Sequence, residues 1–479
     1  MAFTSLRQDA LAGLTTAFAL VPECIAFALV AHLNPLMGLY GAFFICTLTA
    51  LLGGRPGMIS GAAGSMAVVI VALVVQHGAD YLLATVVLGG LLMMLFGALR
   101  LGKLIRMVPH PVMLGFVNGL AIVIALAQLE HFKQGGHWLQ GKALWVMVGL
   151  VVLTMTMVWL LPRLTRAIPP ALMAILGVGM LAAWLDLPTR TLGDMAHIAA
   201  GLPQLHIPQV PWTLDTLRIV LPYAVLMASV GLLETLLTLN LTNEITNTPG
   251  QPDRECVALG AANLASGLFG GMGGCAMIGQ TMINLASGGR GRLSGAVSGG
   301  MILMFILFLS PWIERIPLAA LVGVMFVVAQ QTFAWGSLRV LGKIPRHDAL
   351  VVVAVTVITV FTDLAIAVLC GVIIAALSFA WQHAQDIHAE RSDEGGQRRY
   401  RLRGTLFFAS TTRFQSLFHP AGDPPEVVID CAQLRVVDHS AIAALEALLA
   451  RYRDEGRHVE LAHLSPRCEA LLERAGVRG

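Results

Sequence analysis

Charged residues are scarce in this chain. Only 12% of its 479 residues are Asp, Glu, Lys or Arg, whereas 56% are hydrophobic, and the mean hydropathy is +0.75. So few charges exclude a water-exposed surface for most of the chain and predict a membrane protein. The net charge of +3 is too small and too dispersed for the basic footprint of a nucleic-acid-binding protein, so we expect no nucleic-acid partner.

Cysteine motifs are also missing. The seven cysteines form no C-x-x-C pair and no cluster with histidine, which argues against a disulfide framework and a zinc site, so we expect no metal and no cofactor. We interpret them as small apolar fillers: Cys24, Cys46, Cys256, Cys275, Cys370, Cys431 and Cys468. No motif combines a nucleophile, a base and an oxyanion donor, so an enzyme is not expected. The first apolar stretch lacks a cleavage site and is interpreted as a retained helix.

The charges that are present concentrate at the C-terminal end. Residues 386–479 hold 27 of them, against 32 in residues 1–385. This change in composition predicts a transmembrane domain over residues 1–385 followed by a small soluble domain over residues 386–479.

Apolar runs bounded by proline, glycine and charge predict fourteen transmembrane segments, seven in each half. They are 10–31, 36–52, 62–75, 81–99, 110–129, 143–161 and 168–185, then 218–240, 256–270, 275–286, 293–311, 318–333, 349–362 and 363–382. The third and tenth are too short to cross ~30 Å of hydrocarbon, which takes ~20 helical residues. We interpret these two as half-helices.

Loop charges predict the orientation. With the N-terminus in the cytoplasm, thirteen Lys and Arg residues fall in cytoplasmic loops and five in outer loops, as the positive-inside rule requires. Seven segments per half make the halves inverted repeats, 1–205 and 210–385. We therefore predict a multi-pass protein of the cell inner (plasma) membrane, surrounded by lipid, with both termini cytoplasmic.

A glycine-rich break occurs once in each half. Gly53–Ser65 and Gly270–Gln280 each lie about 40 residues after a lone intramembrane glutamate, Glu23 and Glu234 respectively. A half-helix that begins inside the membrane points its free N–H groups and positive dipole end at the space between the breaks, which favours an anion. Paired interrupted helices are the best sequence indicator of a transporter's substrate site.

Five segments carry a resemblance to a known family. Asp9–Thr15, Val21–Ala28 and Pro35–Tyr40, together with Gly231–Leu237 and Gly260–Gly271, are similar to segments of the sulfate permease (SulP) family, bacterial relatives of pendrin and prestin. The resemblance covers essentially the whole chain. It implies an α-helical polytopic membrane protein with a core and a gate domain, a homodimer, and an anion site at the membrane midplane between the third and tenth helices.

By position, the resemblance implies a substrate site built from several helices. Its members are Glu23 and Phe27, then Ala63, Gly64 and Ser65, then Gly279, Gln280 and Thr281, with Glu234 on the eighth helix. Many relatives carry arginine at the position of Gln280 and several an aromatic residue at that of Ala63. A glutamine donates hydrogen bonds without a fixed charge, which favours coupled anion entry, and the small Ala63 favours a larger anion.

The charges of this site require a second ion. Two helix N-termini offer roughly half a positive charge each, whereas Glu23 and Glu234 offer up to two negative charges. An anion binds poorly beside two ionised carboxylates in a low-dielectric cavity. Either one glutamate is protonated or Na⁺ binds between carboxylate and hydroxyl oxygens. In both cases the anion and the cation bind together, which is the basis of symport.

The two glutamates are predicted to differ in role. Glu23 follows Pro22 in an apolar context and is the predicted proton carrier, the alternative being that it only shapes the fold. Glu234 and Thr238 are spaced i, i+4 and present oxygens for a hard cation on one face. Thr238 has the alternative of a hydrogen bond to the helix carbonyl four residues back. Asn284 either lines the site or supports packing.

The C-terminal region reads as a small α/β domain. Val427–Asp430 and Val459–Leu461 are predicted strands, and Ile442–Tyr452 and Ser465–Ala475 are predicted helices. The pattern resembles the STAS domain of anti-sigma-factor antagonists. The resemblance implies a regulatory role for Ser440, which matches the serine phosphorylated in those antagonists. The alternative is that Ser440 caps the helix that follows.

Together these features predict a secondary active transporter of a small inorganic or carboxylate anion. Sulfate, dicarboxylate and bicarbonate are the candidates, moved by proton-coupled symport through an elevator-like motion. The alternatives are a Na⁺-coupled bicarbonate symporter and an uncoupled anion channel or exchanger. An uncoupled channel, like a motor-like membrane protein, favours a fixed cation in the site, which this chain lacks.

Overall fold

The structure is a computed structural model of the whole chain. It describes residues 2–102, 109–134, 137–164, 169–194, 201–211, 213–340, 343, 345–362, 370, 371, 373, 374, 376, 377, 380, 384–394 and 396–464. The chain divides into two compact units, Met1–Gly371 and Val372–Gly479. This division falls earlier than the boundary predicted after residue 385, within the predicted segment 363–382, most of which lies outside the described residues.

The first unit is helical. Its first half contains α1 (Ala2–Val30), α2 (Pro35–Leu52), α3 (Gly64–His77), α4 (Ala79–Ala98), α5 (His110–Ala127), α6 (Gly141–Leu164) and α7 (Pro170–Trp184). The second half contains α8 (Leu214–Thr246), α9 (Pro252–Leu268), α10 (Ile278–Ala286), α11 (Arg292–Phe308), α12 (Ser310–Glu314), α13 (Leu318–Thr332), α14 (Trp335–Val340) and α15 (Arg346–Phe361). Each of the thirteen segments predicted up to residue 362 coincides with a helix.

Length and composition support a membrane-spanning unit. Within the described residues, six helices are long and apolar enough to cross a membrane: α1, α2, α4, α5 with the turn that follows it, α6 and α8. Helices α3, α7, α11, α13 and α15 are apolar but shorter. The apolar side chains on their outer faces, such as Trp145 and Phe361, are suited to lipid rather than water.

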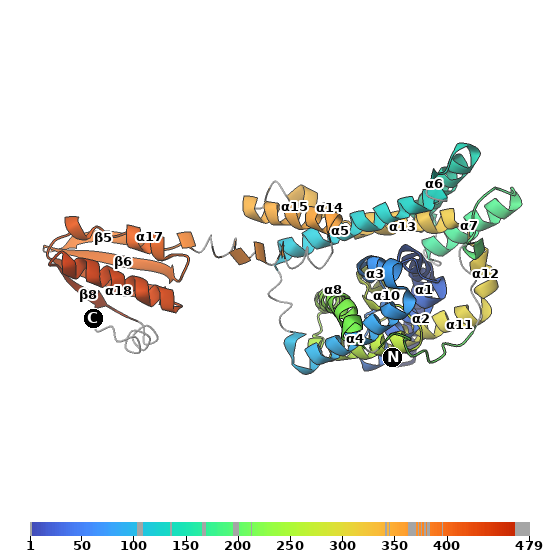
Figure 1. Ribbon diagram of the computed structural model, residues 1–479, viewed down its shortest axis with the longest axis horizontal. Helices are drawn as coiled ribbons and strands as arrows, with labels where there is room; N and C mark the ends of the chain where they lie inside the picture. Colours follow the sequence, from blue (N-terminus) through green and yellow to red (C-terminus); the bar gives the residue numbers. More distant parts are fainter. Residues whose placement is uncertain are drawn as a thin grey trace. The chain divides into compact units, whose positions relative to one another are not determined.

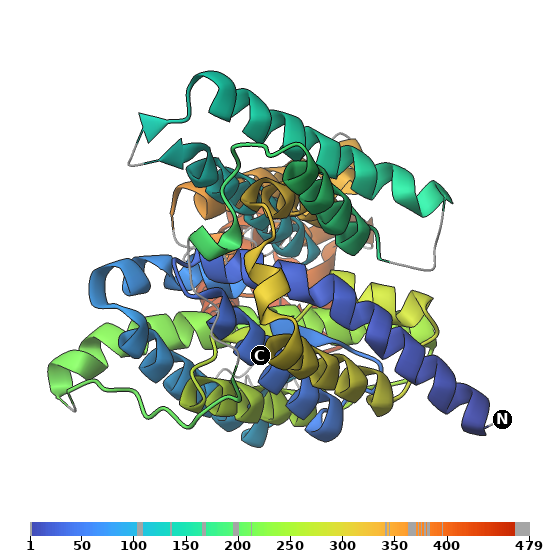
Figure 2. The same cartoon turned by 90° about the vertical axis from the view of Figure 1, so that its right-hand side faces the viewer.

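The helices of this unit form two bundles. The core consists of α1–α4 and α8–α11, in which α4 packs on α8 and α9, and α2 packs on α9 and α11. The gate consists of α5–α7, α13 and α15, with α5 packed on α13 and α15. Figure 1 shows α5 and α13 lying across the core beside α1, α3 and α10, and Figure 2 shows the gate layer from the side. Both halves of the chain contribute to each bundle, as the predicted inverted repeats require.

Close backbone contact holds the core together where α4 crosses α9. A Cβ atom added at Gly90 would lie 2.7 Å from the carbonyl oxygen of Gly260 and 2.7 Å from the backbone nitrogen of Leu264. Glycine at both positions lets the two helices approach closely, the usual way in which membrane helices gain packing energy.

Arginines from the predicted cytoplasmic loops gather at one end of the core. Arg292 donates to the carbonyl oxygens of Ala50 (2.9 Å) and Gly53 (2.7 Å), and Arg254 donates to that of Leu52 (2.8 Å). These cations satisfy the free carbonyls at the C-terminus of α2 and complement its dipole. Arg55 likewise donates to the carbonyl oxygens of Thr242 and Thr248, at and just after the C-terminal end of α8. Their common location agrees with the predicted loop assignment.

The second unit is a small α/β domain. Its four-stranded sheet has the order β5 (His388–Glu394), β6 (Gln397–Leu406), β7 (Glu426–Val436), β8 (His458–Ala462), antiparallel between β5 and β6 and parallel elsewhere. The helices are α17 (Thr411–Ser416) and α18 (His439–Asp454). The predicted strands and the predicted helix 442–452 are confirmed within β7, β8 and α18. The predicted helix 465–475 lies outside the described residues.

The N-terminus of α18 differs from one expectation. Asp438 is the N-cap, and its carboxylate accepts a hydrogen bond from the N–H of Ala441 at 2.9 Å. The alternative in which Ser440 caps this helix is therefore wrong, because the cap position falls two residues earlier and an aspartate takes it. Ser440 instead lies exposed in the first turn.

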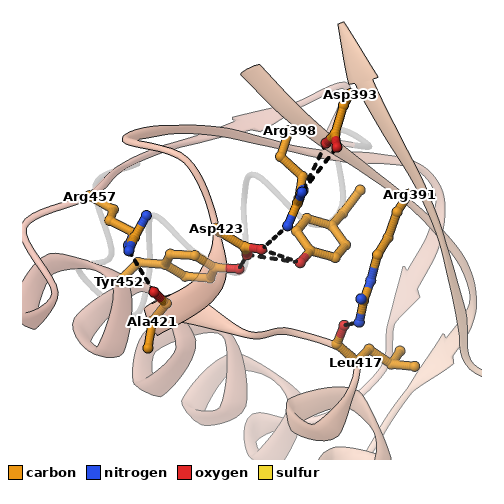
Figure 3. A network of polar contacts seen from close by, with 9 residues as sticks. Arg391, Asp393, Arg398, Leu417, Ala421, Asp423, Tyr452 and Arg457 are labelled. Atoms are coloured by element: carbon orange, nitrogen blue, oxygen red, sulfur yellow. Dashed lines mark hydrogen bonds and ion pairs between the residues drawn. The ribbon is translucent and has the colours of Figure 1, made fainter. Parts of the chain in front are cut away.

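A buried carboxylate links the sheet, α18 and the loop before β7 (Figure 3). The Asp423 side chain is fully buried. It accepts hydrogen bonds from Tyr400 (2.8 Å), from Arg398 (2.8 Å) and from Tyr452. Burial alone would raise the pKa of Asp423, but the donors from Tyr452, Arg398 and Tyr400 outweigh it and hold that pKa below its ordinary value. Arg398 also pairs with Asp393 at 2.8 Å.

This network predicts an acid-sensitive C-terminal domain. Because the pKa of Asp423 is lower in the folded domain than in the unfolded chain, its stabilisation is present above pH about 4 and is lost as the pH falls through the folded-state pKa. Asp423→Asn should destabilise the domain at neutral pH by about 3 kcal/mol, the order of a broken buried ion pair. Amide hydrogen exchange of β6 and β7 in the full-length protein measures the loss of stability, with Asp423→Asn and wild type compared at the same pH.

The exposed Asp454 provides the matched control. Asp454→Asn on the surface of α18 should leave the exchange rates unchanged, and the difference between wild type and Asp423→Asn should shrink below pH about 4. A difference that is constant from pH 3 to pH 7 would show that the charge of Asp423 is not responsible.

Candidate functional site

The two glycine-rich breaks meet in the middle of the core. β1 (Ser60–Ala62) and β4 (Gly274–Ala276) pair as a two-stranded antiparallel ribbon, in which Gly61 lies opposite Cys275 and Ala62 opposite Gly274. A backbone that leaves the helical conformation inside a membrane must find hydrogen bonds elsewhere. Each break supplies them to the other, so the ribbon joins the two halves at the site.

The ribbon corrects the predicted starts of two segments. Ala62 and Cys275 were placed at the beginning of the third and tenth helices, but both belong to strands, and α3 and α10 begin at Gly64 and Ile278. Periodicity cannot separate three apolar strand residues from the first turn of an apolar helix. The prediction of two short helices that follow the breaks is confirmed.

The N-termini of α3 and α10 are open. The residues before them, Ala63 and Met277, have extended backbones and give no side-chain cap. Neither end has a capping side chain, and the first N–H groups of a helix have no partner within it, so both ends present donors and a positive dipole end. Gly279 is exposed, and a Cβ atom there would have no atom within 4 Å. Space for a small solute therefore lies beside the first turn of α10.

Glu234 lies at the junction of the two breaks. One of its oxygens, Oε2, accepts hydrogen bonds from Ser65 at the start of α3 and from the Cys275 thiol in β4, both at 2.7 Å. Glu234 is a half-buried residue, whereas Ser65 and Cys275 are buried. Both partners are neutral, so the charge of an ionised Glu234 is not compensated by them.

Glu23 lies on the other side of the site, on α1. It is half-buried, and its carboxylate interacts with the side chain of Gln280 of α10. Gln280 is buried, and its Oε1 atom finds no hydrogen-bond partner among the described residues. The Phe27 ring, one turn along α1, packs against Gly64, where an added Cβ atom would lie 2.6 Å from the ring. The structure thus brings Glu23, Phe27, Gly64 and Gln280 together.

Three other candidates make structural contacts. The Thr238 hydroxyl donates to the Glu234 carbonyl oxygen at 2.8 Å, which is the alternative considered for it. Thr281 is hydrogen-bonded to the backbone of Ile59, accepting at 3.0 Å. Asn284 donates to the carbonyl oxygen of Gly57 at 2.9 Å. Thr281 and Asn284 are buried and hold the first break against α10.

Sequence patterns did not indicate three residues that shape this site. Asn263 of α9 exchanges two hydrogen bonds with the backbone of Gly274, at 2.9 and 3.0 Å. The Thr235 hydroxyl accepts from the N–H of Ala276 at 3.0 Å. Cys275 binds Glu234. Their polar groups in apolar segments were the available signal, since a buried polar group in a membrane needs a partner.

Among the residues that the structure describes, no cationic side chain pairs with Glu23 or Glu234. Within the described ranges, no group of three or more His, Cys, Asp or Glu side chains is placed to hold a metal ion. The polar side chains that interact with the two site carboxylates are all neutral: Gln280 for Glu23, and Ser65 and Cys275 for Glu234. The site therefore offers donors and negative charge, without a fixed positive side chain against these carboxylates.

A two-bundle helical unit with paired half-helices at its centre defines a polytopic membrane transporter. Its sequence matches the sulfate permease family over residues 6–148 and 136–355 and the STAS domain over residues 391–479. The chain belongs to the sulfate permease family and carries a C-terminal STAS domain.

Two relatives cover nearly the whole chain. YbaR of Bacillus subtilis, named as a sulfate transporter, is 40% identical over 473 residues, which is 98% of this chain and 97% of that protein. The bicarbonate transporter BicA of Synechocystis sp. is 30% identical over 519 residues, covering 99% of this chain and 91% of that protein.

Solved structures show the same fold. The transmembrane domain of a cyanobacterial bicarbonate transporter BicA aligns with a TM-score of 0.68 at 30% identity, over 77% of this chain and 98% of that one. SLC26A9 aligns with a TM-score of 0.83 at 17% identity, over 98% of this chain and 86% of that one. The second likeness concerns the fold alone, and it includes the C-terminal domain.

Proposed function

We propose that this protein is a secondary active transporter of a small anion, sulfate, bicarbonate or a dicarboxylate, coupled to proton entry. Sulfate and bicarbonate are the substrates named for its relatives. The observation that carries the proposal is the combination of two uncapped helix N-termini with two carboxylates whose hydrogen-bond partners are neutral. The dipole ends attract an anion, but only after a carboxylate is neutralised.

Glu23 is the proton carrier in this proposal. It is partly exposed and lies on the core helix that contacts α13 and α7 of the gate. When it is protonated, Gln280 is free to donate its amide hydrogens to the anion, and the first turns of α3 and α10 supply further donors. When it is ionised, repulsion prevents anion binding. Anion and proton therefore load together, which is the requirement for symport.

The two bundles supply the motion. The glycine breaks and both carboxylates belong to the core, whereas α5, α6, α7, α13 and α15 form the gate. Because the ribbon and its hydrogen bonds hold the site within one bundle, an elevator-like displacement of the core against the gate carries the site across the membrane as a unit. Open space lies beside Gly279 in the first turn of α10.

The second candidate is a Na⁺-coupled bicarbonate symporter, favoured by Glu234. One oxygen of its carboxylate is held by Ser65 and Cys275, and no hydrogen bond to the other is found in the described part of the chain. Thr238 donates to a backbone carbonyl, but its oxygen keeps lone pairs that can bind a hard cation. Glu234 and Thr238 are the residues that would bind Na⁺.

Further properties belong to the same proposal. The protein lies in the inner membrane with both termini in the cytoplasm and works as a homodimer surrounded by lipid. The exposed Ser440 at the start of α18 is a regulatory phosphorylation site, because a phosphate there lies at a helix N-terminus, where negative charge is stabilised.

Uptake into proteoliposomes tests the function. Labelled sulfate, bicarbonate and fumarate are offered separately, each with an imposed pH gradient or an imposed Na⁺ gradient. We expect at least one anion to accumulate inside when the outside is acidic. If one proton enters with each anion and no net charge moves, the inside concentration should rise up to about tenfold per pH unit. Accumulation driven by a Na⁺ gradient but not by a pH gradient would contradict proton coupling and support the second candidate, a Na⁺-coupled symporter. Uptake that never exceeds equilibration would show a channel or an exchanger.

A further inference from the structure

The Cys275 thiol has a defined polar role in the middle of the membrane unit. Its Sγ atom donates a hydrogen bond to Glu234 Oε2 at 2.7 Å, the same oxygen that accepts from Ser65. The Ser65 oxygen and the Cys275 sulfur are 3.9 Å apart. These two donors come from the two different breaks and converge on one carboxylate oxygen. Cys275 is therefore no apolar filler, contrary to the interpretation of the sequence.

The position of the thiol is fixed by the backbone around it. Cys275 is the central residue of β4 and lies opposite Gly61 of β1. The neighbouring residues on both sides are held as well, Gly274 by Asn263 and Ala276 by Thr235. Cys275 is completely buried. A donor that is held on both sides in this way restricts the orientation of the acceptor it binds.

The consequence for Glu234 is an asymmetric carboxylate. Oε2 takes both donors, and for Oε1 no hydrogen bond is found within the described residues. Because Glu234 as a whole is only half-buried, Oε1 is the oxygen that remains available to a cation. A carboxylate held by one oxygen keeps the other in place for a cation, whereas an unrestrained carboxylate loses side-chain entropy on binding.

We propose that Cys275 is a positioning residue, whose thiol fixes the Glu234 carboxylate so that Oε1 alone is presented to the coupling cation. This proposal rests on the proposed function for its consequence in transport, but its geometry stands by itself. The thiol acts through Glu234 and does not contact the transported anion.

Uptake by three variants of the full chain tests the consequence. Cys275→Ala removes the donor, Cys275→Ser keeps a hydrogen-bond donor, and Cys256→Ala changes another buried cysteine, on α9. The concentration of the driving cation at half-maximal uptake should change about tenfold in Cys275→Ala, the order for a hydrogen bond to a charged group. For Na⁺ this concentration should rise. For protons it should fall as well, because Glu234 without its donor is neutralised more readily and then opposes anion binding beside a protonated Glu23 less strongly.

The conservative variants separate positioning from packing. Cys275→Ser and Cys256→Ala should stay within about twofold of wild type. Equal cation dependence of Cys275→Ala and wild type, or equal loss in Cys275→Ala and Cys275→Ser, would overturn the proposal.

Infrared spectroscopy of the S–H stretching band gives a readout that does not depend on transport. The Cys275 band is assigned by its loss in Cys275→Ala. It should lie at lower frequency than the other S–H bands, because a carboxylate acceptor weakens the S–H bond, and it should move to higher frequency in Glu234→Gln. If the frequency of the Cys275 band is the same in Glu234→Gln as in wild type, the contact between Cys275 and Glu234 is refuted. A wild type without cation-driven uptake would refute the proposed function while the infrared result still decides the positioning.

Discussion

Glu23→Gln is expected to abolish the accumulation of anion that an imposed pH gradient drives. Glutamine resembles the protonated glutamate in shape and charge but cannot release a proton. The anion should therefore bind and equilibrate at every pH, and accumulation should fall from about tenfold per pH unit to about onefold. The measurement is uptake of the transported anion into proteoliposomes with the outside at about pH 6 and the inside at about pH 7, a gradient of about one pH unit.

The control for this variant is another glutamate of the same unit. Glu244 is exposed near the C-terminal end of α8, and Glu244→Gln should keep the full response to the pH gradient. Equilibration without a gradient should persist in Glu23→Gln, which shows that the protein is folded and binds the anion. Proton-driven accumulation in Glu23→Gln would assign the proton to another group.

Asn263→Ala is expected to destabilise the whole core and to stop transport. Asn263 is completely buried, and its amide both donates to and accepts from the backbone of Gly274, in the ribbon that joins the two halves. Alanine leaves the N–H and the carbonyl of Gly274 without these partners in a region with little water. Each unsatisfied group costs about 1–3 kcal/mol, so the midpoint of thermal denaturation in detergent should fall by on the order of 5–10 °C.

An asparagine outside the site supplies the comparison. Asn240 is exposed on α8, and Asn240→Ala should change the denaturation midpoint and the uptake rate little, as most surface substitutions do. If Asn263→Ala matches Asn240→Ala in both measurements, the ribbon does not depend on its amide support.

The sequence predicted the helices because hydrophobic runs and their punctuation are local. Thirteen segments coincide with helices, and the short third and tenth segments are half-helices that follow glycine breaks. A residue such as Glu23 in an apolar stretch stands out without any structure, since its burial is costly. The short strands 427–430 and 459–461 were recognisable from their local sequence for the same reason, and the likeness to a family added the site positions.

The pairing of groups far apart in the chain was decided only by the tertiary structure. Nothing local distinguishes Cys275, which binds Glu234, from the other buried cysteines, or shows that Ala62 lies opposite Gly274 across a gap of about two hundred residues. Thr238 and Asn284 were ambiguous because a hydroxyl or an amide finds its partner by proximity, not by spacing. Hydrophobicity along the chain determines which segments enter the membrane, whereas the need to satisfy each buried polar group in three dimensions determines how the site is assembled.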